Sequence, residues 1–194
     1  MEKIVFKCLR CGHCCQNLLT DVNDELKGLG LTLEETKLFP EKFVSPSYGI
    51  GYGGKDGPKH ILLYQLTVKQ CPHLSEGNLC KIHEERPLAC RAFPLESVGP
   101  FGTIVEKPTY CRFLEDYIRK HGPLNTQFMT PENFIAPEEW AASSKILEQM
   151  QEMLIGHNRD MDFFWSFSLK TNKWEILATI DTFPFVLQNH LRST

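Results

Sequence analysis

The sequence lacks the features that would place this chain in or across a membrane. No stretch of about 18 consecutive apolar residues occurs in its 194 residues, which excludes an ordinary transmembrane helix. The segment Met1–Cys8 also lacks the apolar core of a secretory signal peptide. We therefore expect a cytoplasmic protein with no membrane partner, because this is the default for a chain with neither signal.

An excess of basic residues is also missing. The chain has 21 Lys and Arg against 24 Asp and Glu, so its net charge is −3. Proteins that bind nucleic acids usually carry a basic stripe, and we therefore predict no nucleic-acid partner. The composition, 42% hydrophobic and 23% charged, is that of a globular protein long enough to bury a sizeable core without disulfides or metals.

Cysteine, by contrast, is abundant and unevenly placed. Four of the eight cysteines lie in the run Cys8-Leu-Arg-Cys-Gly-His-Cys-Cys15, and none follows Cys111. In a reducing compartment, clustered cysteines bind metals or serve redox chemistry more often than they form disulfides. Buried inert cysteines are common singly, but they do not explain four in eight residues. The candidate metal ligands are Cys8, Cys11, Cys14, Cys15, Cys71, Cys80, Cys90 and Cys111.

The spacing Cys8-x2-Cys11-x2-Cys14 is typical of bacterial ferredoxins, in which a further cysteine followed by proline completes the ligand sets of the clusters. Cys71-Pro72 has that form. A C-x2-C pair with a distant second pair suits a tetrahedral zinc site equally well, so the spacing does not decide between the metals. The first choice is an iron–sulfur cluster of the [4Fe-4S] type, and zinc is the alternative.

Cys15 bears on the number of sites. If the backbone is extended here, the side chains of Cys14 and Cys15 point to opposite sides and can hardly bind one ion together. Cys15 is then either not a ligand or part of a second site. Eight thiols divide into two sets of four, and the sequence leaves open whether there are one or two sites and which later cysteines complete them.

The basic residues near the cysteines allow two interpretations. Arg86, Arg91 and His83 could offset the negative charge of thiolates and tune the potential of a cluster, or the arginines could simply pair with carboxylates. His13 and His83 could also be ligands, because imidazole suits both zinc and iron. The simpler interpretation is that the cysteines suffice.

Order, spacing and flanking residues together resemble one family. The segments concerned are Phe6-x-Cys8-x-x-Cys11-Gly-x-Cys14-Cys15, then Cys71-Pro72-x-Leu74, and then Gly77-x-x-Cys80-x-Ile82-His83-x-x-Arg86-Pro87-x-x-Cys90-Arg91-x-Phe93-Pro94. They resemble the CxxCxxCC family of zinc- or iron-chelating domains, the YkgJ-type cysteine cluster proteins, over residues 6 to 94. The resemblance implies metal chelation by the shared cysteines and no settled reaction. Some relatives are described as flagellin lysine methylases, which makes a metal-dependent protein-modifying enzyme an alternative.

A glycine-rich stretch between Gly49 and Asp56 comes close to two phosphate-binding motifs. Both motifs work only between a strand and the N-terminus of a helix. Here Asp56 replaces the hydroxyl residue that binds magnesium, and Gly57-Pro58 follows in place of a helix. We therefore predict a loop over residues 45–58 and no phosphate site.

Local patterns predict both strands and helices. Strands are expected within residues 1–7, 61–68 and 103–105, and residues 163–169 and 174–180 suit a hairpin, although both of these segments suit a helix equally. A capping box of Thr32 and Glu35 predicts a short helix that ends near Phe39. Further helices are expected at residues 113–121 and from Pro137 to about Gly156.

The predicted fold class is α+β, with a small irregular, cysteine-rich, metal-centred half containing short strands and a mainly helical C-terminal half. The expected domains are a cysteine-cluster metal-binding domain at residues 1–122 and a helical appendage at 123–194 packed on it, or one domain overall. The predicted function is a cytoplasmic iron–sulfur protein for electron transfer or a redox-linked reaction, with a protein or redox partner. A structural zinc module that binds other proteins is the main alternative. The sequence identifies no catalytic residue.

Overall fold

The computed structural model describes residues 3–22, 25–52, 57–97, 103–105, 110–124, 130–154 and 163–179. Contacts divide the chain into two compact units. Unit 1 comprises Met1–Leu18 and Lys69–Gln149, and unit 2 comprises Leu19–Val68 and Met150–Thr194. Each unit thus joins two stretches that are distant in the sequence. The domains expected at residues 1–122 and 123–194 stay a prediction, because a division by contacts does not show which stretch folds independently.

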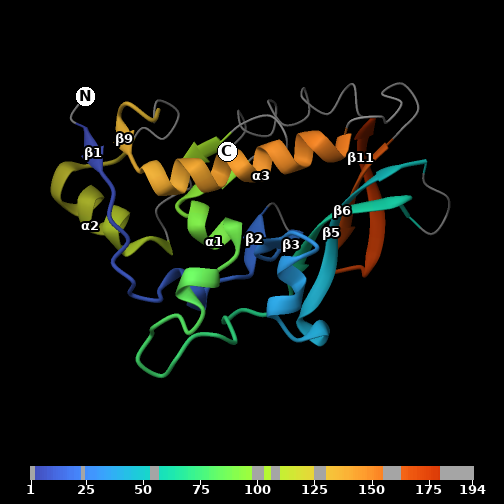
Figure 1. Ribbon diagram of the computed structural model, residues 1–194, viewed down its shortest axis with the longest axis horizontal. Helices are drawn as coiled ribbons and strands as arrows, with labels where there is room; N and C mark the ends of the chain where they lie inside the picture. Colours follow the sequence, from blue (N-terminus) through green and yellow to red (C-terminus); the bar gives the residue numbers. More distant parts are fainter. Residues whose placement is uncertain are drawn as a thin grey trace. The chain divides into compact units, whose positions relative to one another are not determined.

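Unit 1 combines short strands with helices (Figure 1). The strand β1 (Ile4–Val5) pairs in parallel with β9 (Phe134–Ile135), and β7 (Leu95–Ser97) pairs antiparallel with β8 (Thr103–Val105). The helices are α1 (Leu88–Ala92), α2 (Arg112–His121) and α3 (Pro137–Leu154), of which α3 extends beyond the end of the unit. The chain between these elements runs in turns and 3-10 helices at Cys14–Gln16 and His83–Glu85.

The core of unit 1 is a cluster of buried aliphatic residues, Phe134 and Cys111, with partly buried aromatic side chains packed against it. Buried residues from β1, β9 and the start of α2 form one cluster, and the indole N–H of Trp140 donates a hydrogen bond to the Phe134 carbonyl at 3.0 Å. On α1, the buried residues Leu88 and Ala92 pack against Ala142 of α3. These contacts hold the segments that carry the cysteines, because β1 leads into Cys8 and α2 begins directly after Cys111.

Unit 2 contains a five-stranded antiparallel sheet with the strand order β11-β10-β5-β6-β4. A separate hairpin joins β2 to β3, and 3-10 helices lie at Glu35–Leu38 and Glu41–Phe43. The strand bounds are β2 (Thr20–Val22), β3 (Glu25–Lys27), β4 (Gly30–Leu31), β5 (Val44–Gly51), β6 (His60–Leu66), β10 (Phe163–Ser168) and β11 (Lys173–Thr179).

The side chain of Gln65 ties three segments of unit 2 together. It is fully buried, accepts a hydrogen bond from the Gly28 N–H and donates one to the Pro46 carbonyl, each at 2.9 Å. Between β3 and β10, the Lys27 amine donates a hydrogen bond to the Ser166 hydroxyl at 2.7 Å. Since a buried amide without partners is costly, both bonds of Gln65 help to fix the entry into β4.

Several local predictions are confirmed. The Glu35 carboxylate accepts a hydrogen bond from the Thr32 N–H at 2.9 Å, and the Thr32 hydroxyl accepts one from the Glu35 N–H at 3.3 Å, which makes the predicted capping box. The strand β6, the helix α2 and the helix α3 lie where the sequence places them, although Gly156 falls outside the described residues. The segments at 163–168 and 173–179 form the hairpin of β10 and β11.

The predicted fold class is wrong in its C-terminal half. Among its described residues, that half is not mainly helical, because β10 and β11 belong to the five-stranded sheet. The physical reason is pairing with a distant segment: β10 pairs with β5 from Phe163 to Ser166, and Phe164 is buried with Ile50 and Leu62. The adjacent Trp165 is also buried, and its indole N–H donates a hydrogen bond to the Gly51 carbonyl at 3.1 Å.

The loop predicted over residues 45–58 is also wrong in its first part, where β5 runs between β6 and β10. Register shifts on either side of Tyr48 accommodate Pro46 and Gly49 within the strand. Gly49 is needed there because a Cβ atom would lie 2.3 Å from the ring of Pro58. Gly49 and Gly51 are therefore strand residues, β6 follows Gly57-Pro58 in place of a helix, and residues 53–56 lie outside the described part.

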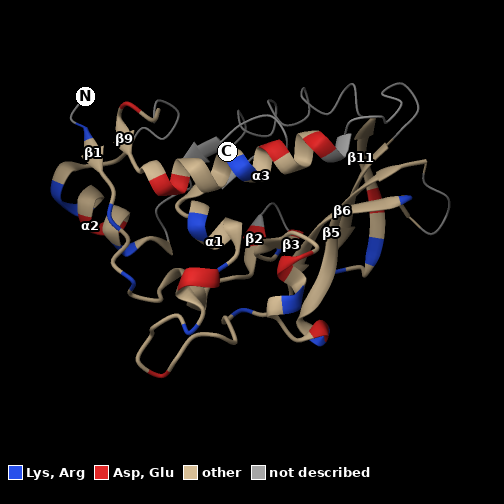
Figure 2. Ribbon diagram, in the orientation of Figure 1, with Lys and Arg blue, Asp and Glu red and all other residues tan. Residues whose placement is uncertain are grey.

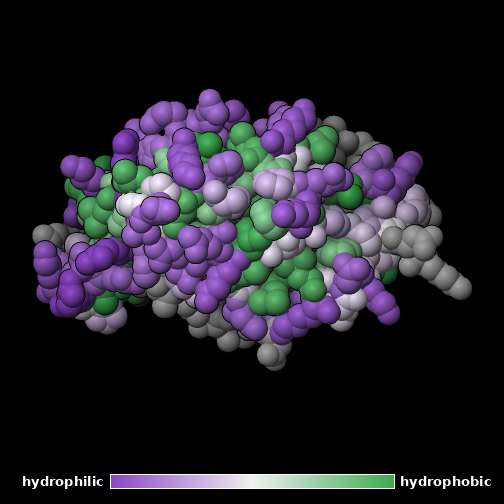
Figure 3. Space-filling model, turned by 90° about the horizontal axis from the view of Figure 1, so that it is seen from below, coloured by the Kyte–Doolittle hydropathy of each residue, from purple (hydrophilic) through white to green (hydrophobic). Residues whose placement is uncertain are grey.

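The surface carries charge of both signs. Figure 2 shows acidic segments at the start and near the end of α3, with a basic residue between them. Large apolar side chains are also exposed, among them Leu9 and Leu79 in unit 1 and Leu33 and Tyr52 in unit 2. The face drawn in Figure 3 accordingly shows hydrophobic residues interspersed with hydrophilic ones. None of the helices in the described part of the chain has the length and hydrophobicity needed to span a bilayer.

The close approach of Gly28 to the neighbouring strand gives a testable prediction for unit 2. A Cβ atom on Gly28 would lie 1.8 Å from the Leu66 carbonyl oxygen, a backbone atom that cannot move independently. We expect Gly28→Ala to lower the free energy of unfolding by about 1–3 kcal/mol, as overpacking does elsewhere. Gly30→Ala is the matched control, because nothing lies within 4 Å of its Cβ position. Equal midpoints of thermal unfolding for the two variants would contradict this packing.

Candidate metal centre

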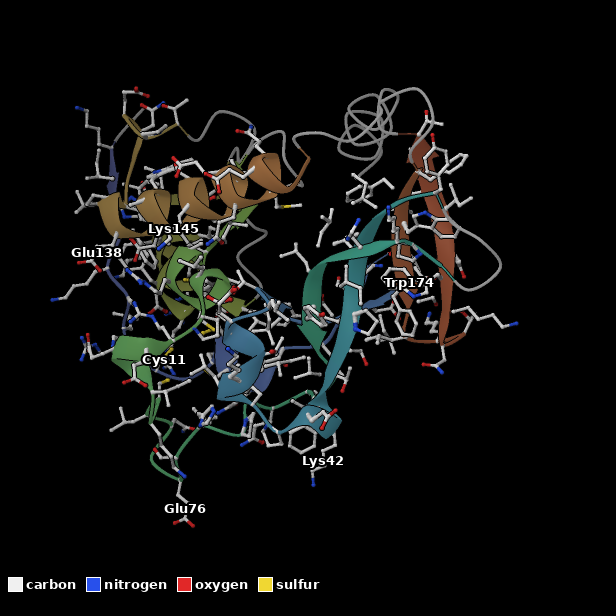
Figure 4. All side chains as sticks on the ribbon, turned by 45° about the vertical axis from the view of Figure 1, so that its right-hand side comes forward. Cys11, Lys42, Glu76, Glu138, Lys145 and Trp174 are labelled. Atoms are coloured by element: carbon white, nitrogen blue, oxygen red, sulfur yellow. The ribbon has the colours of Figure 1, made fainter. Side chains whose placement is uncertain are left out.

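All eight cysteines belong to unit 1, and none of them forms a disulfide. They lie in four places: the N-terminal segment, the turn from Cys71 to Cys80, the helix α1 and the start of α2. Sulfur atoms are visible around the labelled Cys11 in Figure 4. The predicted ligands are thus gathered in one compact unit as free thiols.

The N-terminal segment is anchored immediately before its first cysteine. The Phe6 N–H donates to the Ile135 carbonyl at 2.9 Å, and the Phe6 ring packs edge-on against Phe113 with the centroids 5.2 Å apart. Two left-handed residues, Arg10 and Gly12, then turn the chain between Cys8 and Cys14. Gly12 is required there, because a Cβ atom would lie 2.5 Å from the Asn78 carbonyl oxygen.

The backbone of Cys14 and Cys15 is a 3-10 helix and not extended. The condition under which their side chains would point to opposite sides is therefore not met. The two thiols hydrogen-bond to each other, and this bond, burial and the charge of Cys14 together raise the pKa of Cys15 far above its usual range. Two adjacent thiols this close repel one another once both are ionised, so a bound cation is needed to keep both as thiolates.

The turn from Cys71 to Lys81 is held against this 3-10 helix by one backbone and one side-chain hydrogen bond. The Cys71 N–H donates to the Cys15 carbonyl at 2.8 Å, and the Gln16 side chain donates to the Asn78 side chain at 2.8 Å. Across the turn, Leu74 and Cys80 form a β-bridge. Burial raises the pKa of Cys71, as do the thiols of Cys15 and Cys80, whereas hydrogen bonds from the N–H groups of His73 and Leu74 lower it.

Cys111 occupies the N-cap position of α2 and is 7% exposed. Burial raises its pKa to about 11, and the thiols of Cys8 and Cys11 contribute in the same direction. The N–H groups of Leu114 and Phe113 act on the sulfur in the opposite sense and favour the thiolate. A helix N-terminus also favours a negative charge, so this position is suited to a thiolate ligand.

The amide groups that face the Cys71 and Cys111 sulfurs were missed by sequence reasoning. They follow each cysteine by two and three residues, and both segments have the pattern Cys-x-x-Leu, with Leu74 and Leu114 buried. That repeated pattern is the signal from which the two amide pairs could have been predicted. Cys90 lies half-buried on α1 between the buried residues Leu88 and Ala92.

The histidines and Arg86 contact other protein groups. His13 lies 3.7 Å from the Glu115 carboxylate, and His83 lies 3.0 Å from the Glu84 carboxylate. The Arg86 guanidinium donates a hydrogen bond to the His83 carbonyl at 2.6 Å. Burial raises the pKa of the nearby Glu139 carboxyl above its usual value, and the Arg86 charge offsets part of this rise. These contacts favour the simpler interpretation, in which the arginine and the histidines support the turns and the cysteines are the ligands.

The donor set fits a metal that prefers thiolates. Soft thiolate ligands select zinc, copper(I) and iron–sulfur clusters. Within the described ranges, however, no group of three or more His, Cys, Asp or Glu side chains is already arranged to hold a metal ion. The thiols lie near enough to affect one another's pKa without forming a closed set of ligands.

Free thiols gathered on turns and at a helix N-terminus, with backbone amides directed at two of them, define a cysteine-rich metal-binding protein. A family model described as "CxxCxxCC: Putative zinc- or iron-chelating domain" matches residues 7–120, more than half of the chain. The chain belongs to this family, and the matched region contains all eight cysteines. Neither the comparison with curated proteins nor that with solved structures gave a match.

The environment of Cys111 predicts an unusual pH dependence of its reactivity. Iodoacetamide attacks the thiolate, so the rate at Cys111 in the folded, metal-stripped protein should keep rising to a half-maximum near pH 11. Peptide mapping by mass spectrometry after timed alkylation measures this rate. In the chain unfolded by urea, the half-maximum should fall to the ordinary thiol value near 9. A plateau by pH 9 in the folded protein would show that burial does not suppress this thiolate.

Proposed function

We propose that this chain is an iron–sulfur protein that transfers electrons through a cluster bound by cysteine thiolates. The candidate ligands are the eight cysteines of unit 1, beginning with Cys8, Cys11 and Cys14. A bound cluster supplies one-electron chemistry at a potential set by charge, hydrogen bonds to sulfur and solvent exposure. The observation that carries the proposal is a set of free thiols in one unit, within the region that matches a zinc- or iron-chelating family.

The order and spacing of the cysteines support an iron–sulfur cluster as the first choice. Cys8-x2-Cys11-x2-Cys14 with a later Cys71-Pro72 is the arrangement found in bacterial ferredoxins. Four-sulfur zinc is the alternative, because the same spacing suits a tetrahedral site.

The chain's own backbone would stabilise the ligands and tune the potential. The N–H groups of His73 and Leu74 favour the Cys71 thiolate, and those of Phe113 and Leu114 favour the Cys111 thiolate. Hydrogen bonds to the sulfurs of a cluster reduce the negative charge that accumulates on reduction and so raise the reduction potential. The partial burial of Cys71 and Cys111 limits the access of water to the same sulfurs.

The exposed end of the cysteine set suggests where a redox partner would approach. Cys8 is exposed, its neighbour Leu9 is 47% exposed, and Leu79 beside Cys80 is 59% exposed. Apolar side chains at the surface next to a redox centre are suited to contact with another protein. A reducing compartment such as the cytoplasm fits this role, because the thiols must stay reduced until the cofactor binds.

Metal analysis of the anaerobically purified protein tests the proposal. We expect a brown protein with iron and acid-labile sulfide in equal amounts and with an electron paramagnetic resonance signal that changes on reduction by dithionite. Iron and sulfide measure the cluster, and zinc measured in the same sample serves as the internal comparison. A colourless protein with stoichiometric zinc and no sulfide would instead support a structural zinc module and contradict the iron–sulfur proposal.

A further inference from the structure

We propose that unit 1 holds two separate metal centres, the first on Cys8, Cys11 and Cys111 and the second on Cys14, Cys15, Cys71 and Cys80. This division rests on the proposed function only in its premise that the thiols bind metal, and it holds for either iron or zinc. The evidence for the division is that the N-terminal segment contacts two different parts of the unit, the start of α2 and the turn from Cys71 to Lys81.

The first set is brought together by contacts between the N-terminal segment and the start of α2. Phe6, two residues before Cys8, packs on Phe113, two residues after Cys111. Further along the same segment, His13 lies 3.7 Å from Glu115 of α2. Contacts on both sides of Cys8 and Cys11 therefore hold this stretch against the helix N-terminus, and both thiols act electrostatically on Cys111.

The second set is brought together by contacts between the 3-10 helix Cys14–Gln16 and the turn from Cys71 to Lys81. The Cys71 N–H donates a hydrogen bond to the Cys15 carbonyl, and the Gln16 side chain donates one to the Asn78 side chain. Within the turn, the Lys81 N–H donates to the His73 carbonyl at 2.9 Å, which places Cys80 beside Leu74. The thiols close enough to Cys71 to influence its charge are those of Cys15 and Cys80, and the Cys14 thiol is hydrogen-bonded to that of Cys15.

The two sets share no member, because the first is built against the start of α2 and the second against the turn from Cys71 to Lys81. Gly12, between Cys11 and Cys14, adopts a left-handed conformation, and a Cβ atom there would lie 2.5 Å from the Asn78 carbonyl oxygen and 2.9 Å from the Leu74 side chain.

Single and double variants of the full-length protein test the division. Cys8→Ala removes an exposed ligand of the first set, and Cys80→Ala removes a half-buried ligand of the second. We expect each variant to lose part of the metal of the wild-type protein, with the two losses adding up to the whole and the double variant retaining none. Metal and sulfide per chain are measured after anaerobic purification, and circular dichroism shows whether each variant is folded.

The neighbouring exposed residues supply matched controls. Leu9→Ala and Leu79→Ala change side chains adjacent to Cys8 and Cys80 and should retain the full metal content. Loss of all metal in either cysteine variant would contradict two centres, and unchanged content would remove that cysteine from the ligands. A wild-type protein with zinc alone would contradict the iron–sulfur proposal, whereas additive losses of zinc would still support two centres.

A measurement on the wild-type protein does not depend on whether the variants fold. The protein is treated with increasing concentrations of a chelator, which removes its metal in steps, and the thiols that have lost their metal are alkylated at each step. Mass spectrometry of intact chains then shows which cysteines of one chain carry the alkyl group. We expect partly stripped chains that are alkylated at every thiol of one set and at none of the other. Partly stripped chains that are always alkylated in both sets would contradict the division.

Discussion

Negative charge on closely spaced thiolates is the constraint on which the cysteine-bearing unit depends. Burial and neighbouring thiols both raise the pKa of Cys15, Cys71 and Cys111, so the protonated thiols are favoured while no cation is bound. A metal must displace these protons to bind, and its affinity should therefore rise with pH. The amide pairs at the Cys71 and Cys111 sulfurs oppose the repulsion and prepare these two positions for a thiolate.

The remaining parts of unit 1 set the positions of these thiols. The pairing of β1 with β9 and the packing of Phe6 fix the chain just before Cys8, and α2 begins just after Cys111. Because Cys111 is itself part of the buried core with Ile4, Leu114 and Phe134, loss of that core would displace a candidate ligand. Packing and ligation are thus coupled in this unit, as in other domains whose metal site and fold share residues.

Much of the candidate site could be predicted from the sequence because the spacing of cysteines is local information. The cysteine segments identified the family, and the match over residues 7–120 confirms it. The paired capping bonds of Thr32 and Glu35 were likewise encoded within four residues. The grouping of Cys111 with Cys8 and Cys11 was not predictable in this way, because it depends on long-range contacts such as that of Phe6 with Phe113.

The fold was predicted less well, for the same reason. Pro46 and Gly49 are typical of loops, yet β5 is a strand because β6 and β10 pair with its two edges and register shifts accommodate both residues. The helical C-terminal half was expected from the strong pattern of α3, whereas the hairpin of β10 and β11 gains its stability from a sheet formed with residues 30–66. Such pairings between distant segments are not visible in local periodicity.

X-ray absorption at the iron and zinc edges of the anaerobically purified protein distinguishes an iron–sulfur cluster from a zinc site. We expect iron surrounded by sulfur, with a second shell of iron from the same cluster. Zinc with four sulfurs at about 2.3 Å and no iron, or a metal bound by nitrogen and oxygen in place of sulfur, would contradict this expectation.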